Sequence, residues 1–160
     1  MKLLTKIRLL IIFFIVALIL SGVTAFPVET ELRWLLARPS LIPDAFEAWL
    51  NTVYNALVET NDKYPMLAYG FDWLAFAHIV IAMAFIGPLK DPVKNKWIID
   101  WAIVSCLLIL PLALIAGPIR GIPFFHQLID CAFGIIGLIP LFIVRRDIIR
   151  LERILLINIK

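Results

Sequence analysis

Five polar side chains interrupt strongly apolar stretches of this sequence: Asp72, His78, Arg120, His126 and Asp130. An ionisable group inside hydrocarbon is costly, so it is usually compensated by a partner or has a task. A carboxylate beside an imidazole orients the ring and raises its basicity, which suits proton transfer, and a guanidinium holds anions. His126 and Asp130 are four residues apart and therefore share a helix face. We predict that the five side chains converge on one outward-facing polar pocket.

The same residues allow other interpretations. Metal binding would use His78, His126 and one of the aspartates. However, the sequence contains no HExxH, GxSxG or CxxC motif, so we assign no metal, no cofactor and no catalytic residue. In a structural interpretation, Arg120 neutralises Asp130 or Asp72, and the histidines form hydrogen bonds between helices.

The elements that position these side chains must be membrane helices. Of the 160 residues, 62% are apolar and 17% are charged, which is too apolar for a soluble domain of this size. Roughly 20 helical residues cross the hydrocarbon of a bilayer. Four windows qualify: Leu9 to Phe26, Gly70 to Leu89, Trp97 to Gly117 and Phe124 to Val144. We predict an all-α fold in which residues 1–160 form a single membrane domain, an integral membrane four-helix bundle.

Glycine–proline pairs mark two of the helix ends. We expect Gly87 and Pro88 to end the second helix, and Gly117 and Pro118 to end the third. Glycine tolerates the left-handed cap, whereas proline has no backbone donor and clashes with the preceding turn.

Basic residues predict the orientation of the helices, because Lys and Arg accumulate in short cytoplasmic loops. They gather before the first window, between the second and third, and after the fourth: Lys2, Lys6, Arg8, Lys90, Lys94, Lys96, Arg145, Arg146, Arg150, Arg153 and Lys160. Both termini are therefore expected in the cytoplasm, and the outer region, residues 27–69, faces outward. The net charge of +3 is then a topology signal, and we predict no nucleic-acid partner.

The first window has a second interpretation. Its basic start, the run LLIIFFIVALIL and the small residues up to Ala25 are also typical of a signal peptide. A retained helix is favoured because apolar character continues to Phe26 and because Pro27 would follow the scissile bond directly. Cleavage would leave three helices without changing the orientation of the others.

Two amphipathic stretches lie outside the windows. From Asp44 to Thr60 the apolar residues recur at spacings of three and four: Phe46, Trp49, Leu50, Val53, Tyr54 and Leu57. This pattern predicts an outward-facing amphipathic helix between the first and second transmembrane helices, lying on the membrane or over the bundle. The cytoplasmic tail, Arg145 to Lys160, should extend the fourth helix and lie along the inner leaflet. Packing and anchoring explain both stretches, and either one could also bind a protein partner.

Three further residues have structural explanations. Asp100 lies in the first turn of the third helix, where we expect it to pair with Lys94, Lys96 or Arg145. Gly134 and Gly137 are expected to allow close contact between helices.

The segments FIGPLKDPVKNKW and GPIRGIPFFHQLIDCAFGIIGLIPL are similar to those of uncharacterised small bacterial inner-membrane proteins with four predicted transmembrane helices. The resemblance covers roughly residues 70 to 146 and carries no known activity. It implies a multi-pass protein of the bacterial cytoplasmic membrane, and it assigns no role to any residue.

Two classes of function follow. The first is a non-catalytic membrane protein, such as a subunit, an assembly factor or a partner-binding component. The second is a small transporter or an outward-facing membrane enzyme that uses the five polar residues. The lack of a catalytic motif and the small extramembrane region favour the first class and argue against an enzyme. The sequence specifies neither a substrate nor a partner.

Overall fold

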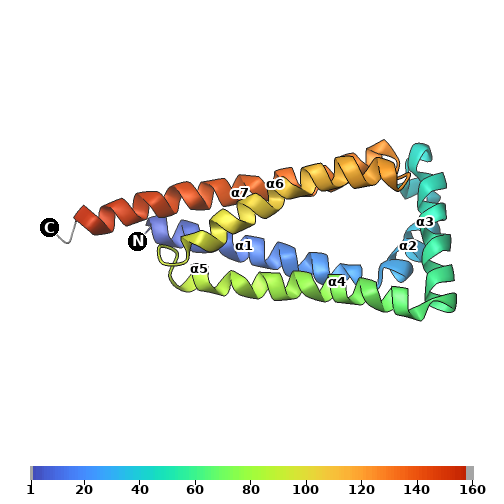
Figure 1. Ribbon diagram of the computed structural model, residues 1–160, viewed down its shortest axis with the longest axis horizontal. Coiled ribbons are helices and arrows are strands. Elements are labelled where there is room, and N and C mark those ends of the chain that lie inside the picture. Colours follow the sequence, from blue (N-terminus) through green and yellow to red (C-terminus); the bar gives the residue numbers. More distant parts are fainter. Residues whose placement is uncertain (1, 158–160) are drawn as a thin grey trace. The chain divides into compact units, whose positions relative to one another are not determined.

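The computed structural model describes residues 2–157, and over that range every regular element is a helix (Figure 1). The helices are α1 (Lys2–Ala25), α2 (Val28–Leu36), the short 3-10 helix η1 (Pro39–Leu41), α3 (Asp44–Lys63), α4 (Pro65–Ala84), α5 (Ile86–Lys90), α6 (Lys96–Ile119) and α7 (Phe124–Ile157). Lys160 and the rest of the predicted tail after Ile157 lie outside the described residues.

Four helical segments are long and apolar enough to cross a membrane: Lys2–Ala25, Pro65–Lys90, Lys96–Ile119 and Phe124–Ile157. Each contains one of the windows predicted from hydropathy, apart from the last residue of the first window. The all-helical, multi-pass character of the chain is therefore confirmed. The packing of the four helices as one bundle and the outward placement of α3 stay predictions.

The described residues fall into two compact units. We call residues 17–81 the α2–α3 unit, because it contains these two helices whole together with the end of α1 and most of α4. We call residues 2–16 and 82–157 the α6–α7 unit, because it contains α5, α6 and α7 whole together with the start of α1.

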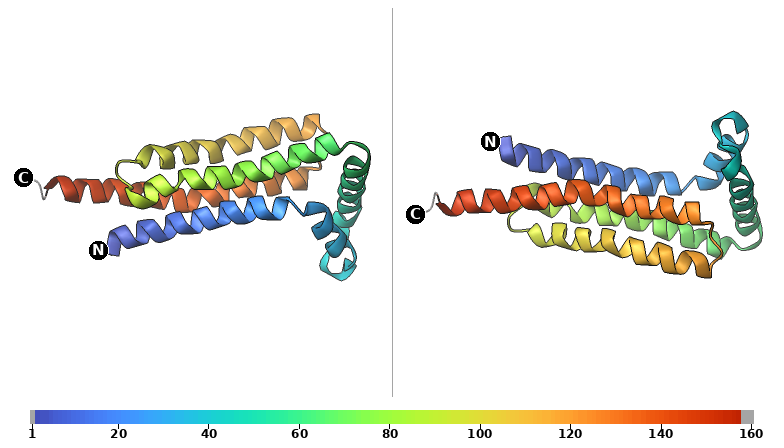
Figure 2. Two further views of the ribbon diagram at one scale, coloured as in Figure 1. Left: turned by 90° about the horizontal axis from the view of Figure 1, so that it is seen from below. Right: turned by 90° about the horizontal axis from the view of Figure 1, so that it is seen from above.

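In the α2–α3 unit, α2 packs against α3 (Figure 2). Polar side chains join the two helices. Glu29 accepts hydrogen bonds from Arg33 on its own helix and from Asn61 on α3. Arg33 Nε also donates to the Tyr54 hydroxyl at 3.2 Å. The hydrogen bond to Tyr54, together with Glu29, raises the pKa of the Arg33 guanidinium.

The burial of α3 follows its sequence pattern. The six apolar residues that predicted the helix are all half-buried, whereas the polar residues opposite them are exposed: Glu47, Asn51, Asn55 and Glu59. The helix begins at Asp44, as predicted, and continues three residues beyond Thr60. An element that hides one apolar stripe and exposes a polar face is typical of a helix at the edge of a hydrophobic layer.

The α6–α7 unit has an apolar core that draws on both ends of the chain. Its largest fully buried side chains are Ile7, Ile11, Phe85, Pro88, Ile99, Leu141, Val144 and Ile148. α6 and α7 lie side by side, and their backbones approach closely at Gly134. A Cβ atom at Gly134 would lie 2.7 Å from the Cys106 carbonyl oxygen, which confirms the expected role of this glycine in helix contact.

The end of the second membrane segment differs from the prediction. α4 ends at Ala84, and a new helix, α5, then runs from Ile86 through Gly87 and Pro88 to Lys90. The reason is that proline has no backbone N–H. Pro88 therefore cannot donate the helical hydrogen bond to the carbonyl oxygen of Ala84, and the helix is interrupted there. The break therefore lies one turn before the proline, and the chain resumes a helix around it.

The end of α6 also differs, because the helix continues through Gly117 and Pro118 to Ile119. The residue that reverses the chain is Gly121, whose φ is +69°. Two backbone hydrogen bonds close the turn, from Ile122 N to Gly117 O and from Gly121 N to Pro118 O. This is the pattern of a Schellman cap, in which a left-handed glycine follows the helix. Gly117 instead lies against the buried Gln127 of α7.

Candidate functional site

His126 and Asp130 are brought together at the start of α7, as their spacing predicted. His126 Nε2 lies 3.9 Å from Asp130 Oδ1, and both side chains are roughly 40% exposed. This distance is too long for a hydrogen bond but short enough for attraction between a protonated imidazole and a carboxylate. The pair is therefore a local contact on one helix face.

Arg120 does not form an ion pair with Asp130, which is one of the two carboxylates that the structural interpretation gave it as partners. Arg120 is the C-cap residue of α6, its side chain is exposed, and within residues 2–157 it has no ion pair. Its backbone N–H donates to the carbonyl oxygens of Ala116 and Gly117, which fixes the residue at the outer rim of the helix end. An exposed pair gains little there and would immobilise a long side chain.

Asp72 and His78 belong to α4 in the α2–α3 unit, whereas the other three candidates belong to the α6–α7 unit. Asp72 is exposed and His78 is half-buried. His78 Nδ1 lies 2.9 Å from the carbonyl oxygen of Leu74, so this ring nitrogen contacts the preceding turn of its own helix. The convergence of all five side chains on one pocket stays a prediction.

The most buried acidic side chain is one that sequence reasoning missed. The Asp147 side chain is only 4% exposed, and its two oxygens face different cations. Lys6 Nζ lies 2.7 Å from Oδ2, and Arg146 Nη2 lies 3.3 Å from Oδ1. A charge that deeply buried persists only when it is paired, and here it joins the start of α1 to α7.

A second ion-pair cluster lies between α6 and α7. Asp100 accepts a hydrogen bond from Arg145 Nε at 2.7 Å and another from Lys96 one turn earlier. The expected pairing of Asp100 is therefore confirmed for two of its three candidate partners. Because Arg145 comes from a different helix, the contact holds α6 and α7 together.

Arg8 joins α1 to the end of α5 by two hydrogen bonds. Its Nε donates to the Leu89 carbonyl oxygen at 3.2 Å, and Nη2 donates to the Lys90 carbonyl oxygen at 3.4 Å. These carbonyls lie at the end of α5, where the last turn of a helix leaves acceptors without intrahelical partners. A cation placed there also complements the negative end of the helix dipole.

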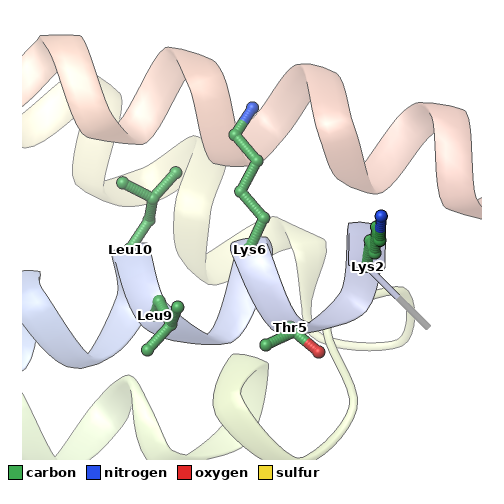
Figure 3. Close-up of a pocket in the computed structure, with 5 residues that line it drawn as sticks. All are labelled: Lys2, Thr5, Lys6, Leu9 and Leu10. Carbon is green, nitrogen blue, oxygen red and sulfur yellow. The ribbon is translucent and has the colours of Figure 1, made fainter.

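A depression lies beside these contacts on α1. It is lined by Lys2, Thr5, Lys6, Leu9 and Leu10. In Figure 3 the Lys6 side chain extends toward the ribbon of α7, which carries its partner Asp147. The depression thus combines charged groups at one end with leucines along the next turns.

Within residues 2–157, no three His, Cys, Asp or Glu side chains are placed to hold a metal ion. No protein-family model matches this chain, and no curated protein or solved structure matches it either.

Proposed function

We propose that this chain is a non-catalytic multi-pass protein of the bacterial inner membrane that acts as a subunit, an assembly factor or a partner-binding component. The observation that carries the proposal is the pairing of Asp147 with Lys6 and Arg146. A buried carboxylate neutralised by two cations joins helices, and it offers no open position for a substrate. The interhelical Asp100–Arg145 pair supports the same conclusion.

The orientation that goes with this proposal places both termini in the cytoplasm and α3 outside. Two surfaces then remain for a partner. One is the exposed polar face of α3, and the other is the end of α7, where Arg150 and Arg153 are exposed. Polar, exposed helix faces suit reversible contacts with another protein or with headgroups.

Site-specific photocrosslinking in intact membranes tests the proposal. A photoreactive residue replaces Asn55 on α3 or Arg153 on α7, and Lys94 in the exposed loop before α6 serves as the matched control. We expect one reproducible protein adduct at Asn55 or Arg153 and none at Lys94. The absence of an adduct at both test positions would count against a partner-binding function.

The second candidate is a small transporter or an outward-facing membrane enzyme. The 3.9 Å contact between His126 and Asp130 favours it, because an imidazole beside a carboxylate suits proton transfer. His126→Ala and Asp130→Asn separate the two candidates in a strain lacking the gene. Variants that accumulate normally but fail to restore the deletion phenotype would support the second candidate, whereas full restoration supports the first.

A further inference from the structure

The depression on α1 has a polar end and an apolar end. Lys2, Lys6 and Leu10 follow one another at intervals of four residues and therefore share a helix face, with Thr5 and Leu9 on the adjoining face. At 1.5 Å of rise per residue, Leu10 lies about 6 Å further along the helix than Lys6. A ligand that fits this arrangement carries an anionic group joined to an apolar chain.

The charges around the polar end favour an anion. Asp147 neutralises part of the charge of Lys6 and Arg146. Lys2, which also lines the depression, is exposed, so the basic groups Lys2, Lys6 and Arg146 outnumber Asp147. A zwitterionic headgroup would bring an ammonium into this excess of positive charge, whereas an anionic headgroup brings none.

The ion pair with Asp147 prepares Lys6 for binding. An ammonium has three N–H donors, and Asp147 accepts one of them at 2.7 Å. The contact holds the side chain in the direction shown in Figure 3, and half of that side chain remains exposed. A phosphate oxygen can then accept from an ammonium that is already in place.

We propose that this depression binds an anionic glycerophospholipid, with its phosphodiester at Lys2 and Lys6 and one acyl chain along Leu9 and Leu10. The inference goes beyond the proposed partner-binding function and does not depend on it. Every residue that lines the depression comes from α1, so neighbouring lipids would supply the remaining wall of the site. If this end of α1 is cytoplasmic, as the basic residues predict, it also meets the leaflet surface where anionic lipids attract basic segments.

The test uses the purified full chain in nanodiscs of phosphatidylcholine with a minor fraction of phosphatidylglycerol. Native mass spectrometry counts the phosphatidylglycerol molecules that stay bound when the disc is stripped. Lys2→Gln removes one exposed lysine from the proposed site, and Lys94→Gln removes one exposed lysine outside it. We expect Lys2→Gln to lower phosphatidylglycerol retention about tenfold, since a direct hydrogen bond to a charged group contributes on that scale. Lys94→Gln removes no such contact and should leave retention unchanged.

A charge-neutral variant provides the second arm. Lys6→Gln combined with Asp147→Asn removes the ion pair without changing the net charge, so a diffuse electrostatic attraction would be unaffected. We expect this double variant to lose retention as well. Soluble glycerol phosphate, added as a competitor, should not displace the bound lipid, because it lacks the acyl chain.

Three results would overturn the proposal. One is equal loss of retention in Lys2→Gln and Lys94→Gln, which indicates general surface charge. Another is equal retention of phosphatidylcholine and phosphatidylglycerol by the unmodified chain. The third is displacement of the lipid by glycerol phosphate, which indicates a site for a free phosphate ester.

Discussion

The Lys6 ammonium and the Asp147 carboxylate lie 2.7 Å apart, although 141 positions separate the two residues in the chain. Half of the Lys6 side chain is exposed, whereas the Asp147 side chain is almost completely buried. The partly exposed Lys6 ammonium therefore neutralises the buried Asp147 carboxylate. This contact ties the first helix of the chain to the last.

We expect Lys6→Ala to destabilise the protein by about 1–3 kcal/mol, because Asp147 then keeps only Arg146 as a partner. Lys6→Met combined with Asp147→Leu should recover most of the loss, since apolar residues can replace a buried pair. Thermal unfolding in detergent measures both. A Lys6→Ala protein as stable as the unmodified chain would show that the contact contributes nothing.

Gly134→Ala should destabilise the α6–α7 contact by about 1–3 kcal/mol, because its Cβ would lie 2.7 Å from the Cys106 carbonyl oxygen. The matched control is Gly70→Ala on α4, where nothing lies within 4 Å of the added atom. That change should be neutral or stabilise the helix by up to about 1 kcal/mol. Equal effects of the two substitutions on the unfolding temperature would contradict the close packing at Gly134.

Gly121→Ala should reduce stability by about 1–2 kcal/mol, since a side chain is strained at a φ of +69°. Gly121→Asn should cost less, because asparagine adopts the left-handed conformation more readily than alanine. Nothing lies within 4 Å of a Cβ at this position, so the comparison isolates the backbone. If Ala and Asn have the same unfolding temperature as Gly, backbone strain is not what selects glycine here.

A reporter that works only in the cytoplasm should be active when fused after Lys160 or inserted within residues 90–96. It should be inactive when inserted within residues 61–65, around the junction of α3 and α4. The physical reason is the concentration of Lys and Arg at one end of the membrane segments. Activity at the position between α3 and α4 would reverse the orientation.

The protein isolated from membranes should retain α1. Ile7 and Ile11 are fully buried in the α6–α7 unit, and the ring centroid of Phe14 lies 4.9 Å from that of Phe85. Removing these side chains would uncover the core and leave Asp147 without Lys6. Intact-mass measurement decides the point, because cleavage near Ala25 would shift the mass by the whole helix.

Hydropathy predicted the four membrane segments because it is a local property that a window of the sequence contains in full. The ends of the segments depend on single hydrogen bonds. Pro88 acts on the carbonyl of Ala84 rather than at its own position, and the left-handed residue after α6 is Gly121 rather than Gly117. A glycine next to a proline therefore indicated a helix end without locating it.

The candidate site shows the same division between local and distant contacts. The His126–Asp130 contact follows from a spacing of four on one helix, and so it could be predicted. Asp147 stands in a basic run that indicated a tail along the inner leaflet, and its main partner is near the other end of the chain. No local pattern could have linked Asp147 to Lys6. The same limit applies to Arg120. Whether it can pair with Asp130 depends on the path of the turn after α6, which the sequence does not specify.

α7 is longer than a membrane crossing requires: its 34 residues span about 50 Å, whereas the hydrocarbon core of a bilayer is roughly 30 Å thick. After Pro140 it continues from Leu141 to Ile157 without a glycine or proline, and this stretch is about 25 Å long at 1.5 Å per residue (red in Figure 2). Arg145 and Asp147 clamp its base to α6 and α1, whereas Arg150 and Arg153 lie toward its tip. Such a stretch is a rigid rod that ion pairs hold near one end. A small tilt at the clamped base becomes a larger sideways displacement at the tip, so loosening one ion pair would move the last arginines.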